Sequence, residues 1–458
     1  MRWICLSLVA LGVWPSALPA ADWNQWRGPN RDGVAAASPA LIDTLPSEGL
    51  EASWMTEKPI AGGGNGGWSS PVIADRRVYL FVHSRTPRPG VQLPPEKYPP
   101  LSEEERTQRS PEEIQTYDAH RRDEQRERRD QQFQYVETLS CFELASGRLL
   151  WESERPSVAT DFCQSGTPAV VNGRVYVLGA DRHLLCFSAK DGKELWSTRL
   201  PVDQNERQIP SSVALAEGVV AVLAGVLVGV DAERGDVLWA GDQERMQGTD
   251  SSPTVWKENG RAFFIANVNG NQTVCVEPQT GNELWRVETH ANRSTPVIVG
   301  SRMITLGDSR KGGVRCFELS AEGAEEVWKF QGISDPGSSP VVVDGKVFVQ
   351  GEHRLACLDL ATGKPDWRGE LDIAQPRYTS LIAADSKLFY IFDGVLVFSA
   401  QPRECSVLID AKIDGAGRLV PAEAYRESLG LEEIKVTRGQ EEAERVWQKE
   451  TSRNAPLN

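Results

Sequence analysis

The sequence lacks the features that nucleic-acid-binding and membrane-spanning proteins need. Acidic residues outnumber basic ones by 64 to 50, so the 458-residue chain has a formal net charge of −14, and no stripe of Lys and Arg stands out against it. An acidic surface repels phosphate backbones, which argues against nucleic acid as a partner. After the first twenty residues, no apolar run approaches the length of a membrane span. The composition is that of a globular protein.

Familiar catalytic and metal-binding patterns are also missing. The 5 histidines are scattered without metal-ligand spacing, and the chain has no Gly-x-Ser-x-Gly elbow and no phosphate-binding loop. The glycine-rich run at 62–67 does not follow a strand in a nucleotide-binding context, so we interpret it as a loop. Residues 412–423 have part of the spacing of a calcium loop, but Lys412 and Ala416 stand at two ligand positions. We expect no metal site.

The N-terminus predicts export. Arg2 precedes an apolar run from Ile4 to Trp14, and small residues follow at 17–21. This order is typical of a secretory signal, residues 1–20, with cleavage after Ala20. We therefore expect a periplasmic or secreted protein with no transmembrane anchor after cleavage. The alternative is an uncleaved N-terminal anchor.

A tryptophan repeat organises most of the remaining chain. Six tryptophans follow one another at intervals of 45, 43, 46, 43 and 39 residues, namely Trp151, Trp196, Trp239, Trp285, Trp328 and Trp367. Most of them end a similar phrase, such as the one from Cys186 through Gly192 to Trp196. In this phrase an apolar strand and a polar turn precede a second strand. The turn glycine supplies a positive φ, so each phrase predicts a β-hairpin.

Each unit also begins alike. A short opening rich in Ser and Thr, such as residues 338–340, leads into alternating β residues and a turn. Proline in the opening suits the innermost strand, which is an edge strand, because proline cannot donate to a ladder. Four strands in each unit of about 40 to 45 residues are typical of a propeller blade. The sequence therefore predicts an all-β fold, a β-propeller of seven to eight four-stranded blades, with each Trp packed between neighbouring blades.

The number of blades is open at this point. Seven openings are present, but Trp54 and Trp447 extend the tryptophan series to eight outer strands. Either an eighth blade is incomplete where the chain ends, or seven blades close and Trp54 is a spare outer strand. We favour the eight-bladed design.

Two insertions, at 84–134 and 401–439, lengthen the first and last units. The first contains a Pro-rich piece and then a highly charged piece that predicts a helix. Ser102 and Glu105 have the spacing of a capping box, and Pro111 is expected to break the helix early. We interpret the piece as a solvated charged arm, with docking of another protein as the alternative.

The repeat resembles that of the pyrroloquinoline-quinone-like β-propellers, a group that includes quinoprotein alcohol dehydrogenases and the outer-membrane assembly scaffold BamB. The resemblance covers roughly residues 54–397 and rests on the Ser-Ser-Pro-Val-Val opening and the Leu-x-Cys-Leu-Asp-x-x-Thr-Gly-x-x-x-Trp phrase. The segment from Trp23 to Gly33 is similar to the leader of many exported bacterial propellers, and we expect it to pack on the propeller. The predicted parts are a leader at 21–53, a propeller at 54–451 and a C-terminal tail at 452–458.

The resemblance implies a cofactor site only in the enzymes of the group. Those enzymes resemble one another in a disulfide between adjacent cysteines, a calcium ion and a catalytic Asp. This chain has no Cys-Cys pair and no Cys-x-x-Cys-His for covalent haem. Five cysteines share one repeat position on different blades, too far apart to pair, and are expected in the core: Cys141, Cys186, Cys275, Cys316 and Cys357. Whether Cys163 and Cys405 pair stays open, and no cofactor is expected.

If a ligand binds, we expect it at the mouth of the central channel, where the residues just ahead of each inner strand converge. These mouth residues are Trp68, Gln164, Gln208, Asp250, Arg293, Asp335 and Arg377. The chain is predicted to be an exported, monomeric, non-catalytic scaffold that binds a protein partner in the cell envelope. One alternative is a dehydrogenase that uses pyrroloquinoline quinone (PQQ) with calcium and Asp250 or Asp335 as base. Another is binding of a carbohydrate or other small ligand at the mouth.

Overall fold

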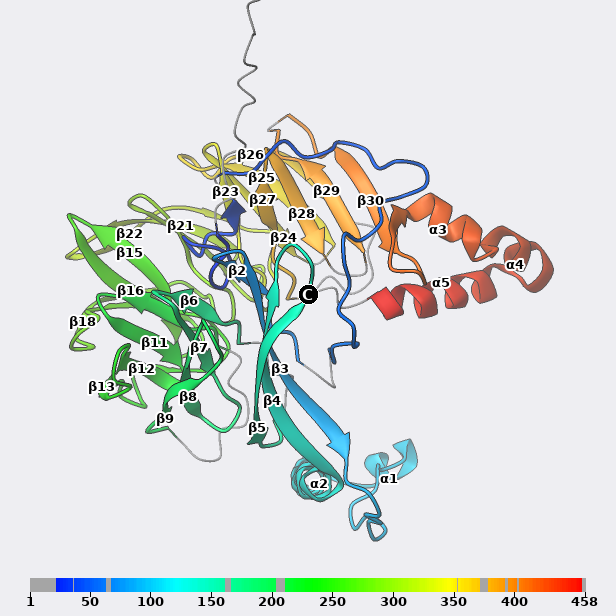
Figure 1. Cartoon of the computed structure of the whole chain (residues 1–458), viewed down its shortest axis with the longest axis horizontal. Helices are drawn as coiled ribbons and strands as arrows, with labels where there is room; N and C mark the ends of the chain where they lie inside the picture. The colour runs from blue at the N-terminus through cyan, green and yellow to red at the C-terminus, as the bar shows by residue number, and fades with distance from the viewer. Residues whose placement is uncertain are drawn as a thin grey trace, which may run out of the picture.

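Seven β-sheets follow one another along the chain (Figure 1). The structure is a computed structural model that describes residues 22–35, 37–62, 67–160, 166–202, 211–351, 353–370, 378–391, 394–401 and 403–454. The predicted signal peptide lies outside these residues. Each sheet contains four antiparallel strands in chain order, and the third and seventh sheets carry additional short strands.

The first four sheets contain the following strands. The first sheet has β2 (Val72–Ala74), β3 (Arg77–Pro87), β4 (Phe133–Glu143) and β5 (Leu149–Ser157). The second has β6 (Ala169–Val171), β7 (Arg174–Leu178), β8 (His183–Ser188) and β9 (Glu194–Arg199). The third has β10 (Ala214–Ala216), β11 (Val219–Leu223), β12 (Gly225–Asp231), β13 (Val237–Ala240) and β14 (Gln247–Gly248). The fourth has β15 (Thr254–Glu258), β16 (Arg261–Val268), β17 (Gln272–Val276) and β18 (Glu283–Glu288).

The last three sheets repeat the pattern. The fifth has β19 (Val297–Val299), β20 (Arg302–Leu306), β21 (Val314–Ser320) and β22 (Gly323–Phe330). The sixth has β23 (Val341–Val343), β24 (Lys346–Gly351), β25 (Arg354–Asp359) and β26 (Pro365–Glu370). The seventh has β27 (Ile382–Ala384), β28 (Lys387–Ile391), β29 (Val395–Ser399) and β30 (Val407–Ile413), with β1 (Val34–Ala35) on its inner edge and β31 (Leu419–Pro421) beyond β30.

The repeat tryptophans join consecutive sheets. In the first six sheets the Trp of the fourth strand lies opposite a small residue of the third strand, Cys in five sheets and Gly229 in the third. Each indole Nε1 donates to a carbonyl 32 to 39 residues further along the chain. This carbonyl lies at the end of the third strand of the following sheet or in the turn between its third and fourth strands. The pairs are Trp151 with Ala189, Trp196 with Ala232, Trp239 with Pro278, Trp285 with Ser320, Trp328 with Leu360 and Trp367 with Gln401.

For four of the six tryptophans, Trp151, Trp196, Trp239 and Trp328, a turn glycine of the next sheet lies against the indole. A Cβ added to Gly281 would lie 2.5 Å from Cδ2 of Trp239, and one added to Gly363 would lie 2.5 Å from Cδ2 of Trp328. Gly281 has a φ of +69°, which an L residue adopts only at a cost. The repeat therefore needs glycine here for two reasons, the turn conformation and the room for the ring.

Hydrophobic cores lie between consecutive sheets. One core combines the second and third sheets, from Leu184 to Val228, and another combines the fifth and sixth, from Ile304 to Leu358. Similar cores lie between the other consecutive pairs, from the first sheet to the seventh.

The Ser/Thr openings link the innermost strands. The backbone N–H of one opening donates to the hydroxyl of the next, in the pairs Ser70 with Thr167, Thr167 with Ser212, Ser212 with Ser252, Thr295 with Ser339, and Ser339 with Ser380. These bonds satisfy buried amides that have no partner within their own sheet. The openings therefore form the inner wall around which the sheets are arranged.

The charged insertion is helical, as predicted, and extends from the first sheet (Figure 1). Its helices are α1 (Glu103–Thr107) and α2 (Pro111–Gln132), and they lie at the end of the long β3–β4 hairpin. The capping box of Ser102 and Glu105 is present, and a second one begins at Ser110. Pro111 is the first residue of α2, so it starts a new helix, because proline needs no amide bond at that position.

The Pro-rich piece of the insertion packs along α2. Both carboxylate oxygens of Glu124 accept backbone N–H groups, from Lys97 and Tyr98, at 2.8 Å each. The Arg128 guanidinium donates to the Pro94 carbonyl at 2.7 Å. The α1–α2 arm, residues 88–132, is therefore an ordered projection whose helices bury no side chain completely.

The prediction that Trp447 lies on an outer strand is wrong. The chain after β31 forms α3 (Ala422–Ser428), α4 (Leu431–Arg438) and α5 (Gln440–Asn454), and Trp447 lies on α5. Its ring contacts the Arg426 guanidinium, 4.3 Å from the ring centroid. The fourth strand of the seventh sheet is β30, which carries no Trp, so tryptophan spacing misplaced the end of that sheet. No described helix is long and apolar enough to cross a membrane.

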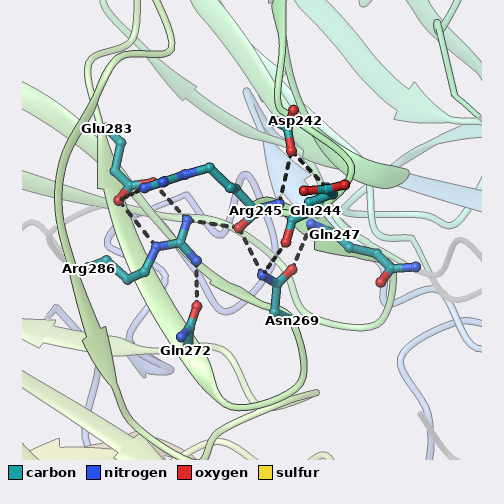
Figure 2. A network of polar contacts seen from close by, with 8 residues as sticks. All are labelled: Asp242, Glu244, Arg245, Gln247, Asn269, Gln272, Glu283 and Arg286. Atoms are coloured by element: carbon teal, nitrogen blue, oxygen red, sulfur yellow. Dashed lines mark hydrogen bonds and ion pairs between the residues drawn. The ribbon is translucent and has the colours of Figure 1, made fainter.

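A polar network fixes the link between the third and fourth sheets (Figure 2). It contains Asp242, Glu244, Arg245, Gln247, Asn269, Gln272, Glu283 and Arg286. The Arg286 guanidinium donates to Glu283 at 2.7 Å and to the Arg245 carbonyl at 2.8 Å. The Asn269 side chain bonds the backbone of Glu244, Arg245 and Gln247. These bonds hold the link from 241 to 247 against the fourth sheet.

The contact between tryptophan and glycine can be tested with matched substitutions. Gly281→Ala forces a strained φ and a collision with Trp239, whereas Gly300→Ala at φ +60° meets nothing within 4 Å. Strain alone should cost about 1–2 kcal/mol in Gly300→Ala, and the collision should add about 1–3 kcal/mol in Gly281→Ala. Urea unfolding followed by far-UV circular dichroism measures both. Equal losses in the two variants would contradict a specific role for the indole contact.

Candidate functional site

The leader occupies the centre of the sheet arrangement. The Ile73 amide donates to the Trp23 carbonyl, and the Val170 amide donates to the Asn24 carbonyl, at 2.8 and 2.7 Å. Further on, β1 pairs in parallel with β27, with Val34 opposite Ala383. The leader thus bonds to the inner strands of the first, second and seventh sheets, and Figure 1 shows it in dark blue among them.

Side chains of the leader also bond to residues just ahead of the inner strands of the third, fifth, sixth and seventh sheets. The Trp26 indole donates to the Thr295 hydroxyl in the fifth sheet at 3.2 Å. Arg31 donates to the Val213 carbonyl in the third sheet at 2.7 Å. Arg27 donates to the carbonyls of Pro340 and Leu381, in the sixth and seventh sheets. Six of the seven sheets therefore bond to the leader.

After β1 the leader covers the outer side of the seventh sheet. Leu45 joins the core of Val397, Ile409 and Ala411, and Leu50 forms a bridge with Leu419 of β31. Trp54 follows, outside any strand. Its Nε1 donates to the Leu144 carbonyl, and a Cβ added to Gly147 would lie 2.2 Å from its ring. Trp54 thus contacts the first sheet in the way each repeat Trp contacts the next sheet.

Two of the mouth residues pair with each other. The Arg293 Nε lies 2.6 Å from Oδ2 of Asp250, and this carboxylate raises the pKa of Arg293 above its ordinary value. Asp308 and Tyr378 also act electrostatically on Arg293. Asp250 is thus engaged in an ion pair with an adjacent cation.

Asp335 is a turn residue that is 2% exposed. Its Oδ1 accepts the backbone N–H groups of Gly337, Ser338 and Tyr378 at 2.9, 2.7 and 3.2 Å. Burial raises its pKa, while the amide bonds oppose that shift. The geometry is that of a side chain that holds the link between the sixth and seventh sheets.

Of the other mouth residues, the structure describes only Trp68. Trp68 is half-buried just before β2. Gln164, Gln208 and Arg377 lie outside the described residues, as does Cys163. Within the described part of the chain, no group of three or more His, Cys, Asp or Glu residues is arranged to hold a metal ion.

The remaining sequence candidates have structural roles. The five repeat cysteines are buried and free, and Cys405 has no disulfide partner among the described residues. The segment that has part of the calcium-loop spacing is the β30–β31 hairpin. Asp414 accepts the amide of Ala416 and pairs with Arg418 at 2.9 Å, so its oxygens serve the turn.

A buried acidic cluster between the first two sheets was not found from the sequence. Glu137 is 1% exposed on β4, and its Oε1 accepts the Ala180 amide. Arg155 pairs with Asp181 at 2.6 Å and lies 3.8 Å from Glu137, while His183 lies 3.0 Å from Asp181. Burial raises the pKa of Glu137 to about 7. Because sheet alternation gives no warning of a charged inward residue, only the packed structure reveals it.

Comparison with known proteins gives matches along most of the repeat region. A family model described as "Outer membrane protein assembly factor BamB" matches residues 130–329 and 270–423, more than half of the chain. The outer membrane protein assembly factor BamB of Burkholderia pseudomallei is 27% identical over 224 residues, which cover 44% of this chain and 55% of that protein. The BamB of Nitrosomonas eutropha is 35% identical over 111 residues, 24% of this chain and 26% of that protein. The chain thus spans about half or less of the length of these relatives.

A solved structure shares the fold at low identity. A quinohemoprotein alcohol dehydrogenase of Pseudomonas putida superimposes with a TM-score of 0.51 at 12% identity, covering 85% of this chain and 72% of that chain. At this identity the likeness concerns the fold alone.

The role of Asp335 can be separated from a catalytic one. Asp335→Asn keeps a carbonyl oxygen for the three amides, so we expect a urea midpoint equal to or above that of the unsubstituted protein at pH 7. Asp335→Ala leaves those amides without the acceptor and should cost about 1–3 kcal/mol. Equal damage by the two substitutions would contradict the turn role.

Glu137 should make stability depend on pH. Its folded pKa of about 7 lies above the ordinary 4.5, so the folded protein holds this proton more tightly than the unfolded chain. Its contribution to stability is full below the unfolded pKa and is lost as pH rises through the folded pKa. The thermal midpoint of Glu137→Gln should therefore rise relative to that of the unsubstituted protein as the pH increases from 5 to 8. The exposed Glu194→Gln is the control, and an identical pH profile for both variants would contradict the assignment.

Proposed function

Because the chain belongs to the family of BamB-like, PQQ-like β-propellers, we propose that it is a non-catalytic scaffold that binds a protein partner in the cell envelope. The observation that carries this proposal is the leader, whose residues bond across the centre to the inner sides of six sheets. Contact with another molecule then falls to the loops and to the α1–α2 arm. The names of the curated relatives, outer membrane protein assembly factors, agree with such a role.

The proposal has three finer features. The seven sheets close into one propeller through the leader, which joins the seventh sheet to the first. The protein acts as a monomer in the periplasm, or is secreted, after loss of residues 1–20. The α1–α2 arm is its docking element because it projects from the first sheet (Figure 1) and because α2 is rich in charged residues, none of which is buried.

The dehydrogenase alternative requires PQQ and calcium, and the described residues do not fit that pair. Calcium takes 6 to 8 oxygen ligands, but Asp250 is paired with Arg293 and Oδ1 of Asp335 is taken up by three amides. The leader also bonds across the centre. Binding of a carbohydrate or other small ligand at the mouth is the remaining alternative, and it has no comparable support.

The α1–α2 arm can be removed cleanly. Pro87 and Phe133 are cross-strand partners at the end of the β3–β4 hairpin, so an Asn-Gly turn can replace residues 88–132. We expect this variant to fold with the circular dichroism and thermal midpoint of the full protein. In the native host, a photo-crosslinking residue in place of exposed Arg122 should give one discrete product with an envelope protein identified by mass spectrometry. The same residue in place of exposed Asp191, away from the arm, should not.

Two outcomes would contradict the proposal. Identical crosslinking patterns from positions 122 and 191 would remove the α1–α2 arm as the docking element. Saturable micromolar binding of PQQ with calcium to the purified protein, together with dye-linked alcohol oxidation, would establish the dehydrogenase alternative.

A further inference from the structure

Two arginines of the leader are buried at the centre and form no ion pair with a carboxylate of the described residues, although Asp32 acts electrostatically on Arg27. Arg27 is 3% exposed and Arg31 is 1% exposed. Arg27 donates to the carbonyls of Asp32, Pro340 and Leu381. Arg31 Nη1 donates to the Val213 carbonyl at 2.7 Å and to Gln25 Oε1 at 3.3 Å. All of these acceptors are neutral.

The unused donors of Arg31 lie on one edge of its guanidinium. Nε and Nη2 of Arg31 are buried and have no acceptor among the residues that the structure describes, and the same holds for Nε of Arg27. Nε and Nη2 point two N–H bonds in parallel, the geometry that binds two oxygens of one anion. This edge of Arg31 therefore has the donor geometry for two oxygens of one anion.

The electrostatics of the centre favour an anion. Burial lowers the pKa of Arg27 to about 10, and burial together with the charge of Arg27 lowers that of Arg31 to about 9. Both shifts show that positive charge is disfavoured here. The nearest acid, Asp32, uses Oδ1 to accept the Val34 amide at 3.0 Å. A buried cation is costly unless it is paired and hydrogen-bonded.

We propose that the centre of the propeller holds one small tetrahedral oxyanion of the sulfate or phosphate class against the Nε and Nη2 edge of Arg31. The anion neutralises the pair of guanidinium groups and joins the leader to the sheets. This site involves neither the mouth residues nor the α1–α2 arm, so it is independent of the proposed scaffold function.

Thermal unfolding at constant ionic strength tests the site in solution. Replacing chloride by sulfate or by phosphate should raise the midpoint of the full protein by several degrees and saturate in the millimolar range, since a ligand of the folded state stabilises it by mass action. Arg31→Gln and Arg31→Lys, which lack the bidentate edge, should lose the saturable part. Exposed Arg234→Gln should keep it, and the unsaturable effect common to all variants is the general effect of these salts on proteins. Equal responses of Arg31→Lys and Arg234→Gln would overturn the proposal.

A crystal grown with selenate decides the matter even if both Arg31 variants fail to fold. We expect one anomalous selenium peak beside Nε and Nη2 of Arg31 in the unsubstituted protein. Comparison of sulfate and phosphate midpoints then distinguishes the two ions. Three results would overturn the proposal. They are water at this edge, a chloride ion there that selenate does not displace, and an adventitious ion only, bound on the surface of the molecule.

Discussion

Each repeat tryptophan donates its indole N–H to a carbonyl of the following sheet or the turn after it, and the arrangement of the sheets depends on that contact. The ring needs room on both sides, which explains a small residue opposite it and a glycine in the next turn. Gly229 is informative, because a Cβ there would lie 2.2 Å from the ring of Trp239. A ring that packs closely and also satisfies its polar N–H adds direction to a hydrophobic contact that would otherwise have none. This accounts for a constant sheet-to-sheet relation in spite of variable loops.

The same contact explains why the leader is needed. A series of sheets joined by tryptophans has a first sheet without a preceding tryptophan and a last sheet with an uncovered face. Trp54 acts as the tryptophan that precedes the first sheet, and Leu45 packs on the face of the last sheet. The inner strands also present carbonyls toward the centre, and Arg27 and Arg31 donate to them. The leader therefore joins the seventh sheet to the first through backbone and side-chain bonds, at the cost of burying two cations.

The repeat was predictable from sequence because its residues act locally. Hairpin turns and alternating strands depend on neighbouring residues, so the openings and the phrase ending in Trp indicated the sheets and the buried cysteines correctly. The capping box at Ser102 was predictable for the same reason. Trp447 failed because spacing alone cannot distinguish a strand from a helix when the local residues are strong helix formers, as they are from 440 to 450.

The candidate site was much less predictable. Asp250 and Arg293 both stand ahead of inner strands in the sequence, but that placement could not show that the two form an ion pair with each other. Arg27, Arg31 and Glu137 are charged residues, and charged residues are normally exposed. Their burial follows from contacts with distant segments, such as Arg27 with Leu381, 354 residues away. No pattern within the leader contains that information.

This separation in sequence also orders the folding of the chain. The leader is synthesised first, but its acceptors in the fifth, sixth and seventh sheets are synthesised last. Consecutive sheets can pack as they emerge, because each tryptophan reaches a partner only 32 to 39 residues ahead. Contacts that close a loop of more than 300 residues carry the larger entropic cost and form later. We therefore expect insertion of the leader to be the last step of folding, which bonds the seventh sheet to the first.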